Sequence, residues 1–562
     1  MLYSTLIIVG LLFVQANAHV IDKRQQKDAV KTSKLPKLKP LAWGDVNFIH
    51  STDTHGWLEG HVLQGSYNGD LGDFYSFVIR MKEKAKKLGK DLFIVDTGDT
   101  HDGDGLSDVT DPRVRTVNEI TIDTVDNFIP HWKDRYLCAN VYLKDVQNNK
   151  TVQIGNKYTY FEGEFGTRVL AYGFLFNFKG NGDKSVITMV EDEIAKPWFK
   201  QSLQAHTPDI ITLIGHIGIR FEEIRTIINA IRAYYPTIPI TVLGGHTHIR
   251  DFTVYDGRAA GIESGRYMET IGFFSADGIY KPSGNVTFSR RYLDQNRASY
   301  IYHSVGRKAK KFDTHVGKKI SKKISKLRKK LHLSQHLGCA PKTYPLESVP
   351  VTDESSIYRL ITQEVLPKTI ADTNRKNVPY FLYNSGGVRY DIYQGPFTLS
   401  NMYQLSPFED AFYRIDNVPL STARKLLPVL NREGEMKKRS IILSQEFHQS
   451  FYTIDSSVQL TPGYVTKDDY GTDGDDTLHT PLPYYPAPAF VGSDLPKDED
   501  DSRLVDIYYL DFFDHQLKGV LTNLTGQSWT SNTTISPYTT NTVWTQYVKN
   551  YWKECPENTL FY

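Results

Sequence analysis

The feature that most restricts the fold of this 562-residue chain is a set of four short apolar runs, each followed within a few residues by acidic or histidine side chains. The runs are VNFIH, DLFIV, DIITL and ITVL. The side chains that follow them are Asp53 and His55, then Asp99, then His216, then His246 and His248. Continuous apolar runs are typical of buried parallel strands, and the sites of α/β proteins lie at the carboxyl ends of such strands. The sequence therefore predicts an α/β fold in which these six side chains converge at one sheet edge.

The spacing of these side chains points to metal chemistry. Asp53 and His55 are two residues apart, as are His246 and His248, and residues two apart on an extended chain face the same way. Imidazoles and carboxylates suit Mn, Zn, Fe or Co better than Ca. Alone, each motif has a simpler explanation, such as an Asx-turn at Asp99. Together they predict two divalent ions, about 4 Å apart, that bind a phosphate between them.

Length and charge restrict the class of protein further. A chain of this length exceeds one ordinary core, so two domains are expected. The formal net charge is +2, which gives no reason to expect nucleic acid or an anionic membrane as the main partner. A small phosphoester fits better, and the oligomeric state stays open.

The first 18 residues are predicted to be a signal peptide. LIIVGLLFV is a short apolar run, and Ala16-Asn17-Ala18 forms an A-x-A cleavage signature. The run is shorter than the roughly 20 residues of a membrane span, which favours a cleaved signal peptide. An uncleaved signal anchor is the alternative. N-x-[ST] sequons begin at Asn149, Asn285, Asn523 and Asn532. These features predict a glycoprotein of the secretory pathway, extracellular or vacuolar.

The chain has three cysteines, Cys138, Cys339 and Cys555. No C-x-x-C motif is present, so neither a disulfide scaffold nor a zinc finger is expected. A Cys339–Cys555 bridge is one option. Cys138 lies in the apolar run YLCANVYL and is expected to be a buried free thiol.

Composition divides the rest of the chain. Residues 19–43 are basic and without periodicity, which predicts a flexible lead-in. Apolar strands alternate with helical stretches over 44–300, where we expect the first α/β domain. A basic linker helix is expected within 301–344 and a second α/β domain over 345–562, with a Pro-rich and acidic loop and an aromatic tail.

The basic linker helix allows two interpretations. Ile320, Ile324, Leu327 and Leu331 form one apolar stripe on it. The plainer interpretation is that this stripe packs on a domain while the lysines face solvent. The other is a helix that binds a membrane surface or a polyanion.

Two groups of motifs resemble known families. DTHG, TGD, GH and GGHTH, in this order, resemble the calcineurin-like metallophosphoesterases. NSGGVR, GPFTLS and PFED resemble the C-terminal domain of 5′-nucleotidases, closest to fungal secreted or vacuolar proteins. The resemblance implies a four-layer αββα sandwich joined to an α/β substrate domain. It also implies hydrolysis of phosphoesters, with a metal-activated hydroxide that attacks phosphorus.

The resemblance further assigns roles to individual residues. One metal would be held by Asp53, His55, Asp99 and His248, and the second by Asp99, His216 and His246, with Asp99 as the bridge. The substrate residues it implies are Asn384, Arg389, Phe408 and Tyr470. From sequence alone, Arg389 could equally be an exposed residue of a tight turn, and Phe408 could be a core residue.

One block of the family pattern is absent. The family has a Gly-Asn-His-Glu/Asp block between the Gly-Asp and Gly-His motifs, and this chain contains no Asn-His dipeptide. The simplest explanation is an internal deletion near NEITIDTVDNF. Loss of its asparagine would weaken the second metal site, and loss of its histidine would leave the catalytic group unknown, with His101 as a weak substitute. The sequence thus predicts an impaired phosphoester hydrolase; the alternative is an inactive nucleotide- or phosphate-binding pseudoenzyme.

Overall fold

The structure is a computed structural model that describes residues 26, 29, 38–108, 121–145, 150–306, 308–442, 474, 485–497, 500, 502–531 and 533–555. The expected signal peptide, most of the lead-in, Tyr470 and the sequons at Asn149 and Asn532 lie outside the described residues. In the described part of the chain, no helix is long and apolar enough to cross a bilayer.

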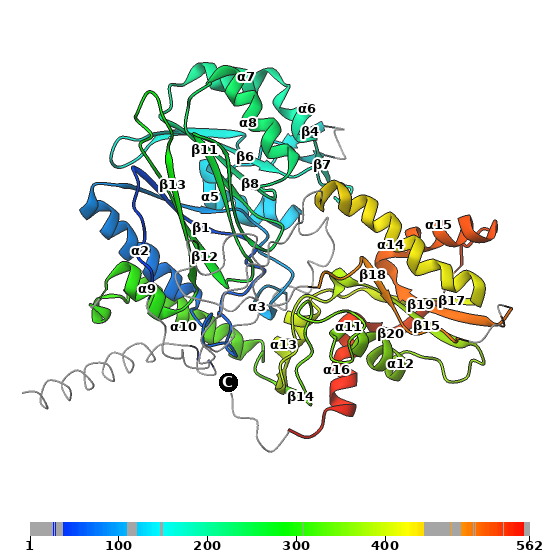
Figure 1. Ribbon diagram of the computed structural model, residues 1–562. Helices are drawn as coiled ribbons and strands as arrows, with labels where there is room; N and C mark the ends of the chain where they lie inside the picture. The colour runs from blue at the N-terminus through cyan, green and yellow to red at the C-terminus, as the bar shows by residue number, and fades with distance from the viewer. Residues whose placement is uncertain are drawn as a thin grey trace, which may run out of the picture.

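Two β-sheets lie face to face in the first domain (Figure 1). One has the order β13-β12-β1-β2 and the other β10-β11-β9-β8-β6-β5. The strands of the first are β1 (Val46–Ser51), β2 (Asp91–Asp96), β12 (Thr270–Asp277) and β13 (Thr287–Asp294). Those of the second are β5 (Tyr158–Glu162), β6 (Arg168–Leu175), β8 (Ile210–His216), β9 (Ile240–Gly244), β10 (Arg250–Asp256) and β11 (Ala259–Ser264). Because β1 runs parallel to β2, and β8 to β9, the four strands that precede the predicted ligands end at the same side.

Helices cover both outer faces of this pair of sheets. Phe48, Ile262 and Phe274 belong to the apolar layer between the sheets. Helices α2 (Leu71–Leu88) and α9 (Arg297–Ser304) pack on the first sheet, through residues such as Phe77 and Tyr300. Helices α6 (Val190–Ile194), α7 (Pro197–Ala205) and α8 (Glu222–Tyr234) pack on the second. The four-layer αββα arrangement is confirmed.

The boundaries of α2 show how the sequence sets these helices. Asp70 caps its N-terminus in a capping box with Asp73, so two backbone N–H groups gain side-chain acceptors. Gly89 ends the helix in the left-handed conformation, with φ at 63°.

The chain that follows β2, where the family block is missing, adds no described strand to the first sheet. Within the described residues, β2 is the outermost strand of its sheet, and Ile94 on it is 37% exposed. The chain that follows contains α3 (Gly105–Asp108), helical turns at Thr124–Phe128 and Lys133–Arg135, and α5 (Ile129–Trp132). It then forms a separate sheet of β3 (Val141–Asp145), β4 (Lys150–Gln153) and β7 (Ser185–Ile187). Asn140 is buried there and hydrogen-bonds backbone groups of Leu175 and Thr188, so it does not replace the missing asparagine.

Helix α10 (His315–Lys330) lies within the stretch expected to be a linker. Its apolar stripe packs with Leu106 and Leu333 in a small buried cluster. Its lysines are exposed. The packing of the stripe and the exposure of the lysines are as the plainer interpretation expects, and binding of a membrane surface or a polyanion stays a prediction.

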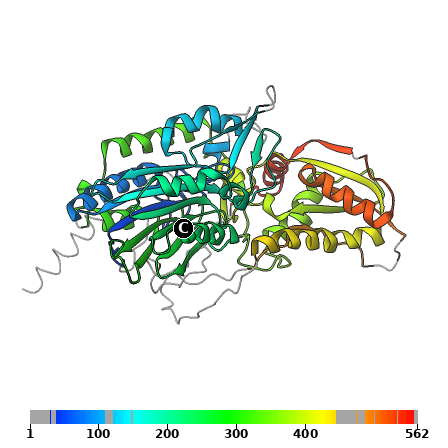
Figure 2. The same cartoon turned by 90° about the horizontal axis from the view of Figure 1, so that it is seen from above.

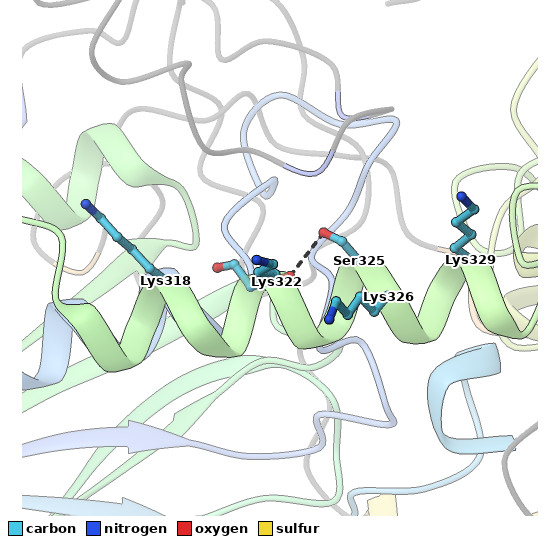
Figure 3. Close-up of a pocket in the computed structure, with 6 residues that line it drawn as sticks. Lys318, Lys322, Ser325, Lys326 and Lys329 are labelled. Carbon is cyan, nitrogen blue, oxygen red and sulfur yellow. Dashed lines mark hydrogen bonds between the residues drawn. The ribbon is translucent and has the colours of Figure 1, made fainter.

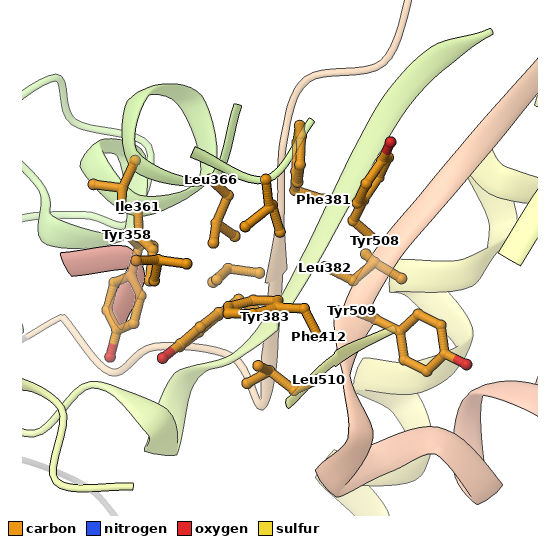
Figure 4. Close-up of a cluster of buried hydrophobic side chains, with 14 of the residues drawn as sticks. Tyr358, Ile361, Leu366, Phe381, Leu382, Tyr383, Phe412, Tyr508, Tyr509 and Leu510 are labelled. Atoms are coloured by element: carbon orange, nitrogen blue, oxygen red, sulfur yellow. The ribbon is translucent and has the colours of Figure 1, made fainter. Parts of the chain in front are cut away.

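The second domain surrounds a five-stranded sheet of order β18-β15-β19-β17-β20. Its strands are β15 (Val378–Asn384), β17 (Ala411–Pro419), β18 (Phe490–Gly492), β19 (Leu504–Leu510) and β20 (Thr533–Thr539). The helices around it are α11 (Ile357–Leu360), α12 (Leu366–Thr369), α13 (Leu399–Leu405), α14 (Leu420–Ile442), α15 (Asp514–Thr525) and α16 (Thr540–Tyr551). Figure 4 shows Phe381, Leu382 and Tyr383 of β15 among the side chains of its core. The aromatic tail belongs to this core, since Trp544 is fully buried.

A smaller pair of strands, β14 (His336–Ala340) and β16 (Gly395–Thr398), carries the disulfide. Cys339 is bonded to Cys555 with a Cα–Cα distance of 5.0 Å. Cys138 is a buried free thiol, as expected.

The two domains lie side by side (Figures 1 and 2) and meet through aromatic residues. Tyr390 Oη of the second domain lies 3.0 Å from His61 Nδ1 and donates to Gln64 Oε1 at 2.9 Å. Its ring lies 4.8 Å from that of Trp57. This contact places the turn that carries Arg389 next to the first domain.

Candidate functional site

Five of the six predicted metal ligands lie in loops that directly follow the strands, and His216 is the last residue of β8. Asp53, His55, Asp99, His246 and His248 all have positive φ angles, between 44° and 83°. Non-glycine residues rarely adopt this conformation, and such backbone strain is concentrated at functional sites. The expectation that Asp53 and His55, or His246 and His248, project from an extended chain is therefore wrong. These side chains are oriented toward one another by left-handed turns of the backbone, and not by the alternating side-chain directions of a β-strand.

Four of the six predicted ligands form a tight group. The ligand atoms of Asp53, His55, Asp99 and His248 all lie within 4.8 Å of one another. His55 Nε2 is 3.3 Å from Asp99 Oδ2 and 3.2 Å from His248 Nε2. His248 Nε2 is 3.2 Å from Asp53 Oδ1. This is the set that the family resemblance assigns to one metal.

The remaining two histidines lie beside this group. His216 Nε2 is 3.6 Å from Asp99 Oδ2 and 3.8 Å from Asp53 Oδ1. The ring of His246 lies 5.2 Å from that of His216 and stacks on Phe176 at 4.0 Å. Asp99 thus lies between His55 and His216, as a bridging ligand would.

Neighbouring backbone groups fix the orientation of the imidazoles. His55 Nδ1 donates to the carbonyl oxygens of His101 and Asp102, at 2.5 and 3.1 Å. His216 Nδ1 donates to the carbonyl of Thr97 at 3.1 Å. Because a neutral imidazole carries one N–H, each Nε2 is left as an acceptor that faces the group.

The protonation states also suit a cation. Burial would raise the pKa of Asp53, but His216, His248 and His55 outweigh it and hold this pKa below its ordinary range. Burial would likewise raise the pKa of Asp99, but His55 and His216 hold it low. Burial lowers the pKa of His248 to about 4. Ionised carboxylates and neutral imidazoles are the forms that bind metal, so these residues fit a divalent ion.

The second domain brings Arg389 close to this group. Tyr267 Oη of the first domain donates to the carbonyl of Arg389 at 3.3 Å, and the charge of Arg389 contributes to the pKa values of His248 and Asp102. The guanidinium carbon lies 5.4 Å from the ring centroid of Phe408. The buried Nε of Arg389 and Oδ1 of Asn384 have no hydrogen-bond partner among the described residues. The structure thus places Arg389 beside Phe408, with Asn384 at the end of β15, just before the turn that leads to Arg389. Tyr470 lies outside the described part.

The comparisons with known proteins agree with this architecture. A family model described as the C-terminal domain of NAD nucleotidase matches residues 343–518. The crystal structure of 5′-nucleotidase from Candida albicans SC5314 covers 92% of this chain and 100% of its own, with 33% sequence identity and a TM-score of 0.81. The chain belongs to the 5′-nucleotidase family. The chain is also 36% identical to an uncharacterized protein of Schizosaccharomyces pombe, over 92% of this chain and 93% of that one. It is 34% identical to a "Secreted protein" of Arthroderma benhamiae, over 87% of each chain.

Glu263 is a residue of this 5′-nucleotidase-type site that the sequence analysis missed. Its fully buried carboxylate accepts from Thr247 N at 3.0 Å, from Thr247 Oγ1, and from Ile219 N at 3.3 Å. Glu263 therefore ties the loop of His246 and His248 to the loop after His216. The only signal for it was a charged residue inside the apolar run of β11 (AAGIES).

His101, the weak substitute for the absent family histidine, contacts the site through its backbone. Its carbonyl oxygen accepts from His55 Nδ1, and its side chain is half-buried. A catalytic role for its imidazole stays a prediction.

Proposed function

We propose that this 5′-nucleotidase family member hydrolyses phosphoesters of the nucleotide class with two divalent cations, Mn, Zn, Fe or Co. The observation that supports the proposal most strongly is the group of carboxylates and imidazoles at the strand ends, which lies close to Arg389 of the second domain. Asp53, His55, Asp99 and His248 would hold one ion. Asp99, His216 and His246 would hold the other.

Bound divalent ions polarise a phosphoryl oxygen and supply a nucleophile at neutral pH. The residues of the chain set where that chemistry takes place. Asp99, between His55 and His216, would contribute its carboxylate to both metal sites. The carbonyls of His101 and Thr97 keep Nε2 of His55 and of His216 turned toward the other ligands.

The second domain is proposed to select the substrate. Arg389 would bind the substrate phosphate, since its buried Nε needs an acceptor and guanidinium pairs well with phosphate oxygens. Phe408, beside the guanidinium, offers a ring on which a base could stack. Asn384 would accept from a donor on the same ligand.

We also propose that turnover is slow. The Asn-His pair of the family is absent from the sequence, and β2 ends its sheet among the described residues. Loss of one positioned acid or base lowers rates by a factor of about 10²–10⁴. The same absence favours the second candidate function, a pseudoenzyme that binds a nucleotide or phosphate without cleaving it.

One comparison separates these candidates. Phosphate release from a nucleoside 5′-monophosphate is measured with Mn²⁺ for the chain as it stands, and for a variant with Gly-Asn-His-Glu inserted between Arg115 and Ile122. Slow, metal-dependent release that rises at least 100-fold on insertion supports the impaired enzyme. No release from the unmodified chain, with retained nucleotide binding, supports the pseudoenzyme. Equal rates would show that the block is not needed here.

We place this activity in the secretory pathway, extracellular or vacuolar. Support comes from the Arthroderma relative that is named a secreted protein, and from the exposed sequon residues Asn285 and Asn523. We propose domain limits of 44–300 and 345–562, joined by the 301–344 segment.

A further inference from the structure

One side of helix α10 is lined with positively charged side chains. It carries seven lysines and no acidic side chain: Lys318, Lys319, Lys322, Lys323, Lys326, Lys329 and Lys330. At 100° per residue, all seven fall within an arc of about 140°. All are exposed, and none forms an ion pair with another described residue. We call this arc the lysine face.

The opposite side of α10 is fixed to the protein. Ile324 and Arg328 are buried, and Arg328 pairs with the buried carboxylate of Glu59. The backbones of Gly72 and Gly317 approach so closely that a Cβ on Gly72 would lie 2.3 Å from Gly317 O. The apolar stripe is therefore unavailable to a bilayer, and any attachment through α10 must be electrostatic.

Among the residues that the structure describes, the lysine face is open to solvent along the helix. Figure 3 shows Lys318, Lys322, Lys326 and Lys329 projecting from α10. Gln26 contacts the helix at Ser325, whose hydroxyl donates to Gln26 Oε1 at 2.7 Å. Ser325 lies just outside the arc of lysines, so this contact covers none of the seven lysines.

The charge is local rather than a property of the whole molecule. The chain has a formal net charge of +2, so seven positive charges on one helix are balanced elsewhere. Selection for a basic protein as a whole would not place them on one face. The concentration of charge points to an acidic partner at this face.

We propose that the lysine face docks the protein on a bilayer that contains anionic phospholipids, on the lumenal or outer face, which is the side that a protein of the secretory pathway meets. Clusters of four to eight basic residues on a helix bind such headgroups, and lysine needs no fixed geometry to do so. The lysines span an arc of about 140° on the helix, so together they present a broad positive surface to a flat bilayer. A linear polyanion would need only a single row of them. The exposed positions of α10 also lack the aromatic side chains on which single-stranded nucleic acid stacks.

The test is sedimentation of the full chain with vesicles at low salt. Neutral phosphatidylcholine vesicles are compared with vesicles that contain phosphatidylserine. We expect binding to the anionic vesicles alone, lost at 0.5 M NaCl because salt screens exposed charges. Replacing Lys318, Lys322, Lys326 and Lys329 together by Gln should weaken partitioning roughly 10²–10³-fold.

A matched variant separates the lysine face from total charge. Lys87, Lys200, Lys376 and Lys425 are exposed on other elements, and their replacement by Gln removes the same four charges. This variant should bind vesicles within about threefold of the parent, and both variants should melt at the parent temperature.

Three results would overturn the proposal. The first is no binding of the parent to anionic vesicles. The second is equal loss in the two variants, which would show a net-charge effect. The third is binding to inorganic polyphosphate without binding to vesicles, which would assign the face to a polymer.

Discussion

Replacement of Asp99 by Asn is the sharpest perturbation of the proposed metal centre. Asp99 Oδ2 lies 3.3 Å from His55 Nε2 and 3.6 Å from His216 Nε2, so its carboxylate serves both halves of the site. Asn keeps the size of the side chain and removes the charge. Two unit charges 4 Å apart attract by about 4 kcal/mol at an effective dielectric of 20. Loss of this attraction should weaken binding of a divalent cation by at least about 10³-fold.

The assay is metal content after dialysis, together with phosphoester hydrolysis at saturating Mn²⁺. We expect Asp99→Asn to lose bound metal and whatever activity the parent has. Asp192→Asn, an exposed change on α6, is the matched control and should behave like the parent. If Asp99→Asn keeps its metal and hydrolyses within tenfold of the parent, Asp99 is not a ligand and the proposed site is wrong.

Three further predictions address substrate binding, the support of the ligands and pH. Arg389→Ala should raise KM for a nucleotide about 10–100-fold while sparing small aryl phosphodiesters, because a charged hydrogen bond is worth about 1.5–3 kcal/mol; equal losses on both substrates would make Arg389 structural. Glu263→Ala should weaken Mn²⁺ binding about 10–100-fold, as measured by titration, because the loops of His216 and His246 lose their common acceptor; Glu263→Gln should lose less, and unchanged affinity in Glu263→Ala would refute this positioning role. Burial lowers the pKa of His50 to about 3. Below pH 6.5 the unfolded chain therefore binds a proton that the folded chain does not, and the free energy of unfolding should decrease as the pH is lowered from 6.5. His50→Gln should therefore show a smaller fall in melting temperature between pH 6.5 and pH 4.5 than the parent, and an identical fall would contradict this origin.

The strand pattern predicted the fold and the location of the site because it depends on short-range features of the sequence. A buried parallel strand is a short apolar run, and its carboxyl end is where its side chains meet those of its neighbours. This places Asp99 after β2 and His216 at the end of β8 without knowledge of the sheet order. Helix α10 could be predicted for the same reason, because its apolar stripe is also a short-range pattern.

What the sequence could not predict depends on contacts between distant segments. The left-handed turns at Asp53 and His248 could not be predicted. Asp and His adopt positive φ more often than most residues, but only a small fraction of them do, so the residue type alone does not mark the turn. Glu263 matters because β11 places it against two loops that precede it by 16 and 44 residues. The nearness of Arg389 to His248 depends on how the two domains meet, which no local pattern records.

The most direct test of the central claim is the number of divalent ions bound per chain, measured by elemental analysis after loading with Mn²⁺ or Zn²⁺ and dialysis. The account predicts one firmly bound ion, at Asp53, His55, Asp99 and His248. It predicts a second, weaker ion, which is filled only at high metal concentration and is lost first in a His216→Ala variant. A chain that binds no ion at any concentration, or whose binding is unchanged by His248→Ala, would contradict the account.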